Sequence, residues 1–138
     1  MTVLTEAITV SSYGMRAQGA RIKVISENVA NAGVAAPTPD ENPYAKQRVV
    51  FKSELDRKLG LDLVRVDKVN QDEDVEFPQK YMPDHPGADA NGFVKMPNVE
   101  PLLELADMRE AQRTYEANLG MVENSRRMIM RTVDILRA

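Results

Sequence analysis

The chain has 138 residues, a formal net charge of -3 and no cysteine. This length accommodates one ordinary domain, or a small domain with long appendages. The absence of cysteine excludes disulfides and thiolate chemistry, and the weakly negative charge excludes a general electrostatic attraction to nucleic acid or anionic membranes.

The N-terminal segment, MTVLTEAITVSSYGM, does not have the composition of a secretory signal. Its basic region is missing because the first basic residue is Arg16, and Glu6 adds an acidic charge. No apolar run in the chain approaches the roughly 18 to 20 residues that a membrane-spanning helix needs. We therefore expect that any export of the protein leaves this segment uncleaved.

Proline divides the chain into three regions. Seven of the eight prolines lie between Pro37 and Pro97, and the remaining one is Pro101. Since proline costs about 3 kcal/mol in a helix interior, the two flanks are predicted to be helical and the middle irregular or β. The predicted segments are an N-terminal helix in 1–33, a small β-rich middle domain with extended loops in 34–97, and a C-terminal helix in 98–138 that pairs with the first.

The first helix, predicted over residues 3–30, has apolar residues at intervals of three and four. This spacing is typical of a helix that packs along another helix. One face carries Leu4, Ile8, Ser11, Met15, Gln18, Ile22, Ile25 and Val29. A second stripe widens it with Val3, Ala7, Val10, Gly14, Ala17 and Val24.

The second helix is predicted over residues 99–136, with Asn98 as its N-cap and Pro101 within its first turn. Acidic residues gather at its beginning and arginines at its end, which complements the helix macrodipole. Its stripe consists of Leu105, Met108, Gln112, Tyr115, Leu119, Val122, Arg126, Ile129, Val133 and Leu136. Further apolar residues broaden it: Met121, Met128 and Ile135.

The middle region is predicted to form a small β module of three or four strands. Its second strand-like run changes the phase of its alternation at Leu63-Val64, which predicts a β-bulge there. The four runs are at 46–51, 61–69, 75–77 and 92–96.

Catalytic chemistry lacks its usual residues in this chain. His85 is the only histidine and cysteine is absent, so neither a metal site nor a nucleophilic triad has its common parts. We expect His85 to have a structural role in its proline-flanked turn. Asp89, Asn91 and Gly92 match three positions of a calcium loop, but the leading Asp and the final Glu of that loop are missing. We predict no enzymatic activity, no metal and no cofactor.

Two interpretations of the matching helical stripes remain open. The helices form a hairpin with a core of its own, or their apolar faces also pack on neighbouring copies of the chain. The second is favoured because the middle region is too small and too polar to cover both stripes. A soluble coiled-coil adaptor of fixed oligomeric order is the alternative function for such a pattern.

Four stretches of the sequence carry a resemblance to a known family: NVAN at 28–31, PYAKQRVVF at 43–51, PDHPGADANGFVKMPNV at 83–99 and DMREAQRTYEAN at 107–118. With them the chain resembles, from end to end, the FlgC family of bacterial flagellar basal-body rod proteins, the proximal-rod subunits. The first motif is shared by rod and hook proteins in general, whereas the last two are specific to this subunit. Members usually have a threonine shortly after the second asparagine, where this chain has Ala32-Gly33-Val34-Ala35.

The resemblance implies a structural subunit that is mainly α with a small β insertion, in which long terminal helices pair as an antiparallel coiled coil. Such subunits polymerise into the periplasmic drive shaft that transmits torque and encloses the export channel, after export without a cleaved signal. Neither nucleic-acid binding nor direct membrane insertion is expected. The implied partners are other copies of the chain, the rod proteins FlgB, FlgF and FlgG, the MS-ring/rod adaptor FliE and the flagellar type III export apparatus.

The expected assembly interface combines the apolar stripes with the family's motif positions. Asn28 and Asn31 lie three residues apart on one helix face, with the small Ala30 between them. We interpret the asparagines either as groups that end the helix and bind a neighbouring chain, or as local caps only. The expected interface residues are Leu4, Ile8, Met15, Ile22, Ile25, Asn28, Val29, Ala30, Asn31, Leu105, Met108, Arg113, Tyr115, Asn118, Leu119, Val122, Ile129, Val133 and Leu136.

Overall fold

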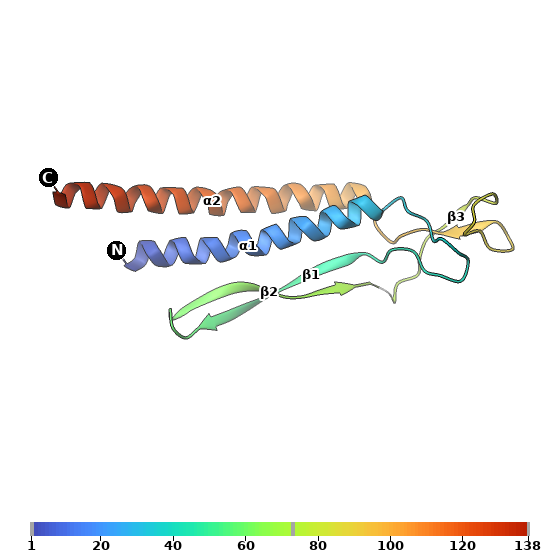
Figure 1. Cartoon of the computed structure of the whole chain (residues 1–138), viewed down its shortest axis with the longest axis horizontal. Coiled ribbons are helices and arrows are strands. Elements are labelled where there is room, and N and C mark those ends of the chain that lie inside the picture. The colour runs from blue at the N-terminus through green and yellow to red at the C-terminus, as the bar shows by residue number, and fades with distance from the viewer. Residues whose placement is uncertain (1, 73, 138) are drawn as a thin grey trace.

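The computed structural model describes residues 2–72 and 74–137, and these form an elongated molecule of two long helices and two small β-sheets (Figure 1). Its mainly α composition with a small β part agrees with the prediction from sequence. The elements are α1 (Thr2–Asn31), β1 (Gln47–Asp56), β2 (Leu61–Gln71), β3 (Gln79–Tyr81), β4 (Phe93–Lys95) and α2 (Pro101–Arg137).

The helix boundaries agree with the predicted ones to within two residues, but the residue predicted to cap the start of α2 does not cap it. Pro101 is its first residue, where the missing N–H leaves no helical hydrogen bond unmade. The N–H of Glu104 donates to the carbonyl of Glu100 at 3.1 Å, so Glu100 directly precedes the helix. The prediction of Asn98 as N-cap was wrong because its side chain binds backbone groups of the middle region instead.

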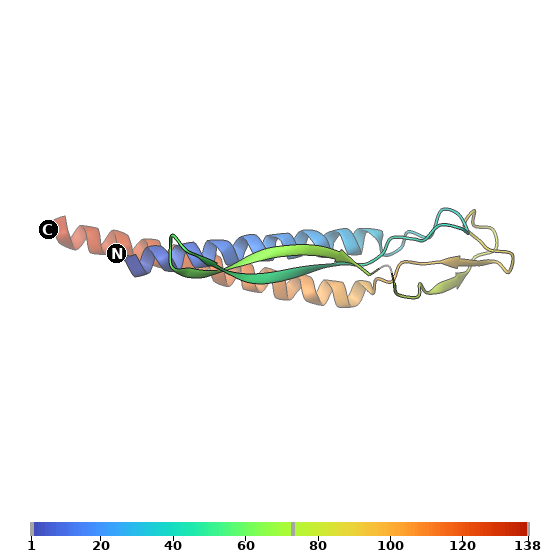
Figure 2. The same cartoon turned by 90° about the horizontal axis from the view of Figure 1, so that it is seen from below.

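Helix α1 is the central layer of the molecule. Helix α2 lies along one side of it, with the two chain termini at the same end, and the β1–β2 hairpin lies along the other side (Figures 1 and 2). The C-terminal end of α2 projects beyond the start of α1 (Figure 1). Across residues 2–72 and 74–137, neither helix combines the length and the hydropathy needed to cross a bilayer.

The β1–β2 hairpin is a two-stranded antiparallel ribbon with one irregularity. Asp67 is an extra residue in β2, because it has no partner between those of Val50 and Phe51. The predicted β-bulge therefore exists, but its predicted place at Leu63-Val64 was wrong. The ribbon continues regularly there, and the apolar doublet reflects burial, since Leu63 is fully buried and Val64 is half-buried.

A small apolar core and one aromatic ring hold the hairpin against α1. Leu63 of β2 is buried, as are Ala17 and Val24 of α1. The guanidinium carbon of Arg65 lies 5.3 Å from the centre of the Tyr13 ring, in a cation–π contact between β2 and α1. The ribbon is therefore positioned against the middle of α1.

The β3–β4 sheet lies at the end of the molecule away from the termini (Figure 1). The rings of Tyr81 and Phe93 meet edge to face across the two strands, with their centroids 5.5 Å apart. The predicted strand at 75–77 was wrong, since these residues are irregular and pairing with β4 begins only after Pro78. The carbonyl of Pro78 still accepts a hydrogen bond from Met96 N–H at 2.8 Å.

The turn between β3 and β4 docks against the segment that leaves α1. The N–H of Ala36 donates to the carbonyl of Lys95 at 3.0 Å, and Gly87 lies so close that an added Cβ would overlap the Ala36 carbonyl oxygen. His85 Nδ1 accepts a hydrogen bond from Gly87 N–H at 2.9 Å. His85 therefore has the structural role expected for it.

Candidate functional site

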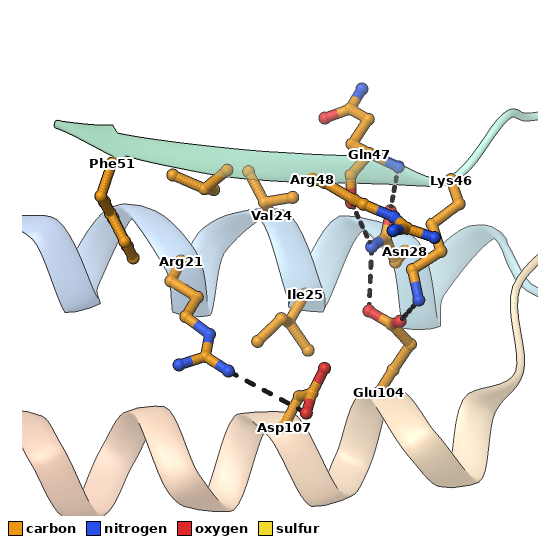
Figure 3. A pocket seen from close by; sticks show the side chains of 11 residues that line it. Arg21, Val24, Ile25, Asn28, Lys46, Gln47, Arg48, Phe51, Glu104 and Asp107 are labelled. Atoms are coloured by element: carbon orange, nitrogen blue, oxygen red, sulfur yellow. Dashed lines mark hydrogen bonds and ion pairs between the residues drawn. The ribbon is translucent and has the colours of Figure 1, made fainter. Parts of the chain in front are cut away.

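A buried asparagine near the end of α1 joins three segments of the chain: α1, the start of β1 and α2 (Figure 3). Asn28 is 1% exposed, and its Nδ2 donates to the Gln47 carbonyl and to Glu104 Oε2, both at 2.9 Å. Its Oδ1 accepts hydrogen bonds from Tyr44 Oη at 2.7 Å and from Gln47 N–H at 2.9 Å. An amide has two donors and two acceptor lone pairs, so all of its hydrogen-bonding capacity is used within the chain.

Asn28 and Glu104, together with Lys46, Tyr44 and Gln47, form a polar cluster that we call the hub. Glu104 lies in the first turn of α2. It is 1% exposed, and Lys46 Nζ lies 2.5 Å from its Oε1. A buried carboxylate is tolerated only when it is paired and hydrogen-bonded, and here Lys46 and Asn28 supply those partners. The hub therefore fixes α1, α2 and the start of β1 relative to one another.

The connection into α2 is fixed by a second asparagine. Asn98 Oδ1 accepts a hydrogen bond from Lys46 N–H at 2.8 Å, and its Nδ2 donates to the carbonyl of Asp72 at 3.2 Å. The chain on both sides of the hairpin is thus tied to the residue that leads into α2. Asn98 positions Lys46, which in turn pairs with the Glu104 carboxylate.

A groove of about 390 Å³ lies beside the hub, between α1, α2 and β1 (Figure 3). Its basic side chains already have acidic partners: Arg21 lies 3.9 Å from Asp107, and Arg48 lies 2.8 Å from Asp72. Within residues 2–72 and 74–137, no group of three His, Cys, Asp or Glu side chains could hold a metal ion. The ion pairs that line the groove therefore help to hold the packed elements together.

The ionisation of Tyr44 makes the stability of the hub depend on pH. Burial raises the pKa of the Tyr44 hydroxyl above its ordinary value, and the nearby Glu27 and Glu104 carboxylates raise it further. A raised pKa means that the contribution of Tyr44 is complete below about pH 10 and is lost as pH rises through the folded-state pKa. We expect Tyr44→Phe to cost about 1 kcal/mol at neutral pH, through loss of the hydrogen bond to Asn28.

Urea unfolding at several pH values would measure this effect. The difference in unfolding free energy between the unmodified chain and Tyr44→Phe should narrow above about pH 10, because only the unmodified side chain ionises. A difference that stays constant through this range would contradict the assignment.

The predicted interface residues of α1 occupy several environments. Ile25 and Asn28 are buried, Ala30 is exposed, and Asn31 is half-buried with its Nδ2 donating to the Glu27 carbonyl at 2.8 Å. Asn31 thus forms a local hydrogen bond, whereas the hydrogen bonds of Asn28 are all made to other segments of the same chain. The half-buried members are Leu4, Ile8, Met15, Ile22 and Val29.

The predicted interface residues of α2 separate into two groups. One group faces inward and is half-buried: Met108, Tyr115, Asn118, Val122, Ile129 and Val133. The other group is exposed: Leu105, Arg113, Leu119 and Leu136.

Small and polar residues of α2 are buried or half-buried on the side that faces α1, and of these the sequence predicted only Asn118 as an interface residue. Glu104, Ala111 and Ser125 are each no more than 3% exposed, and Asn118 completes a series with a spacing of seven residues. Opposite Asn118 lies Gly14, where an added Cβ would be 2.9 Å from Asn118 Oδ1. The spacing of seven and the glycine in the facing helix are the signals that identify this close contact.

A second set of large apolar side chains of α2 is not covered by α1. Those that are exposed are Leu102, Leu103, Leu105, Leu119, Met121, Met128, Met130, Ile135 and Leu136. A helix that leaves this many large apolar side chains exposed has unburied surface for a further contact.

Known proteins resemble this chain over almost its whole length. It is 43% identical to the flagellar basal-body rod protein FlgC of Agrobacterium fabrum, with 100% of this chain and 99% of that protein covered. Identity is 36% to the FlgC of Borreliella burgdorferi and 32% to that of Salmonella typhimurium, each with 96% of this chain and 97% of the relative covered. Residues 90–135 also match the family described as "Flagellar basal body rod FlgEFG protein C-terminal".

In the chain itself, the buried hub of Asn28 and Glu104 holds the two long helices together. The chain belongs to the FlgC family of flagellar basal-body rod proteins, and it is a structural subunit of the flagellar basal body rather than an enzyme.

Proposed function

We propose that the chain polymerises through α1 and α2 into the proximal rod, the drive shaft that transmits torque and encloses the export channel. The observation that supports this most strongly is the outward placement of the large apolar residues of α2. Their burial is worth about 25 cal/mol per Å², and a single chain does not obtain that free energy. Contact with neighbouring subunits does obtain it.

In this proposal the three segments have different tasks. The helices of 1–33 and 98–138 pair as an antiparallel coiled coil and form the polymerising part, while 34–97 is a separate domain on the outside. Support comes from the hub, because Asn28 and Glu104 hold the two helices together where the middle segment begins and ends. The hairpin packs on α1, which leaves α2 accessible on its other sides (Figure 1).

The partners and location follow from the same assembly. Other copies of the chain, FlgB, FlgF, FlgG and FliE would meet the exposed surface of α2 in a periplasmic rod. Export through the flagellar type III apparatus would leave the N-terminal segment in place. Leu4 and Ile8 support this, since both are half-buried parts of α1 and cleavage would remove them from the helix pair.

The test is to make the exposed surface of α2 polar without disturbing the helix pair. We expect Leu119→Ser combined with Met128→Ser to retain the helix content of the unmodified chain by circular dichroism, because both side chains are exposed. Mixed with the other rod subunits, this variant should fail to form tubular assemblies, whereas we expect electron microscopy to show them for the unmodified chain.

The matched control is Leu55→Ser combined with Leu59→Ser, at exposed apolar positions of the hairpin tip. This variant should assemble normally. Normal assembly of the α2 variant would contradict the proposal. A discrete dimer or tetramer of the unmodified chain, unchanged by rod partners, would favour a soluble adaptor instead.

A further inference from the structure

The surfaces by which α1 and α2 meet repeat at intervals of seven residues, which is the repeat that keeps two helices in contact along their length. Two contacts show how the repeats are aligned. Asn28 Nδ2 donates to Glu104 Oε2 at 2.9 Å, and a Cβ added to Gly14 would lie 2.9 Å from Asn118 Oδ1. The repeat on α1 consists of Ala7, Gly14, Arg21 and Asn28, and that on α2 of Glu104, Ala111, Asn118 and Ser125.

This alignment leaves one end of α2 without a partner in the helix pair. Helix α1 has 30 residues and α2 has 37, and the alignment brings the last residue of α1, Asn31, level with the first residue of α2, Pro101. The seven additional residues of α2, 131–137, therefore extend past the start of α1 (Figure 1). Ile135 and Leu136 lie in this extension, and they are 76% and 81% exposed.

The same repeat would also allow a second alignment. Moving α2 by seven residues, or roughly 10 Å, places Ser125 opposite Gly14 and Ala111 opposite Asn28, and neither small side chain obstructs the contact. The whole length of α1 would still be covered, because α2 is longer by one repeat. This shift would also bring Leu136 against α1. Packing of the repeats therefore does not by itself decide between the two alignments.

We infer that the hub is a register lock, which selects the observed alignment and excludes the shifted one. In the shifted alignment Glu104 would lie beyond the end of α1, and Asn28 would face Ala111, which has no acceptor in its side chain. The ion pair between Glu104 and Lys46 Nζ, at 2.5 Å, ties the same carboxylate to the start of β1. A buried polar contact at one position is a device by which paired helices specify their register.

The lock has a consequence for the free end of α2. It keeps residues 131–137 outside the helix pair, where their apolar side chains are open to other subunits. This consequence rests on the proposed function, whereas the lock itself is a property of the single chain.

The absence of cysteine in the chain makes disulfide cross-linking a clean test of register. The full chain would carry Ala7→Cys together with either Ser125→Cys, for the observed alignment, or Thr132→Cys, for the shifted one. These positions on α2 differ by roughly 10 Å along the helix, and a disulfide spans at most about 7 Å between Cα atoms. In dilute oxidised chain with an intact hub, we expect an intramolecular cross-link for the Ser125→Cys pair and none for the Thr132→Cys pair.

The same two cysteine pairs would then be placed in chains without the lock. One is Glu104→Ala, and the other combines Glu104→Ala with Lys46→Met, so that no unpaired buried charge remains. In both backgrounds the rate of cross-linking of the Thr132→Cys pair should rise by about tenfold or more, at the expense of the Ser125→Cys pair. Mass spectrometry of the monomer identifies each cross-link, and circular dichroism measures the helix content.

Ala7→Cys with Asn118→Cys is the matched control. It reports a shift of seven residues in the opposite direction, which would leave the last seven residues of α1 uncovered, and it should stay free of cross-links. Equal increases at Asn118→Cys and Thr132→Cys would show general loosening of the helix pair and overturn the register lock. An unchanged preference for Ser125→Cys in both hub variants would also overturn it. Loss of helix content in both would show that the hub is needed for the helices to form, which contradicts a role in register.

The outcome does not depend on assembly, because every measurement is made on the single chain. Cross-linking through Thr132→Cys in the chain with an intact hub would overturn the lock and leave the proposed function standing. Failure of the unmodified chain to assemble would overturn the proposed function and leave the lock standing.

Discussion

Replacing Glu104 with alanine is expected to lower the free energy of unfolding by about 3 to 5 kcal/mol. The substitution removes the carboxylate that pairs with Lys46 Nζ at 2.5 Å and accepts a hydrogen bond from Asn28 Nδ2 at 2.9 Å. Lys46 then keeps a largely buried charge without its partner, and Asn28 keeps a buried N–H without an acceptor. Urea unfolding followed by far-ultraviolet circular dichroism measures the loss.

Asp107, one turn further along α2, provides the matched control. Its side chain is 52% exposed and lies 3.9 Å from Arg21, so this is a surface ion pair. Surface pairs contribute about 0 to 1 kcal/mol, and Asp107→Ala should cost no more than that. Equal effects at the two positions would mean that the hub does not hold the helices together.

Gly87→Ala is expected to cost about 3 kcal/mol in the local stability of the β3–β4 sheet. The added methyl group would overlap the carbonyl oxygen of Ala36, which belongs to the backbone and cannot rotate away. The turn and the segment after α1 must then separate. Native-state hydrogen exchange would show this as faster exchange of the Ala36 amide, which donates to Lys95 in the unmodified chain.

The control for this substitution is a glycine with open space around it. Gly120, inside α2, has no atom within 4 Å of an added Cβ. Gly120→Ala should stabilise the chain by about 0.5 to 1 kcal/mol, since alanine is the better helix former. Unchanged exchange at Ala36 in Gly87→Ala would show that the turn does not depend on this close approach.

The two helices could be predicted from sequence because their signals are local. Apolar residues recur at intervals of three and four, and proline is confined to the middle and to Pro101, the first residue of α2. The face by which α2 meets α1 could be predicted only in part, since Met108, Tyr115 and Val122 of the predicted stripe face inward and other members of it do not. A regular spacing of apolar residues predicts that those residues are buried. In α2, however, Leu105 and Leu119 are exposed, whereas the small residues Ala111 and Ser125 are buried.

The hub was beyond prediction from sequence for a different reason. The sequence places Asn28 in the NVAN motif near the end of a helix, but its partners come from positions 16, 19 and 76 residues away in the chain. Hydrogen-bond partners at such separations depend on the finished fold. Glu104, which interrupts the apolar start of α2, is the residue whose placement indicates a buried polar contact.

The two-stranded form of the β1–β2 ribbon has a consequence for a protein that must crowd with its own copies. Both members of such a ribbon are edge strands, each with one row of backbone N–H and C=O groups outside the ladder. Open edges of this kind can pair with strands of other chains and lead to aggregation. Charged side chains on the strands disfavour such pairing. Lys52, Glu54, Arg65 and Asp67 form such a charged surface, with Lys52 Nζ 3.5 Å from Glu54 and 3.6 Å from Asp67. The ribbon is thereby kept from joining ribbons of other copies, and association is left to the helices.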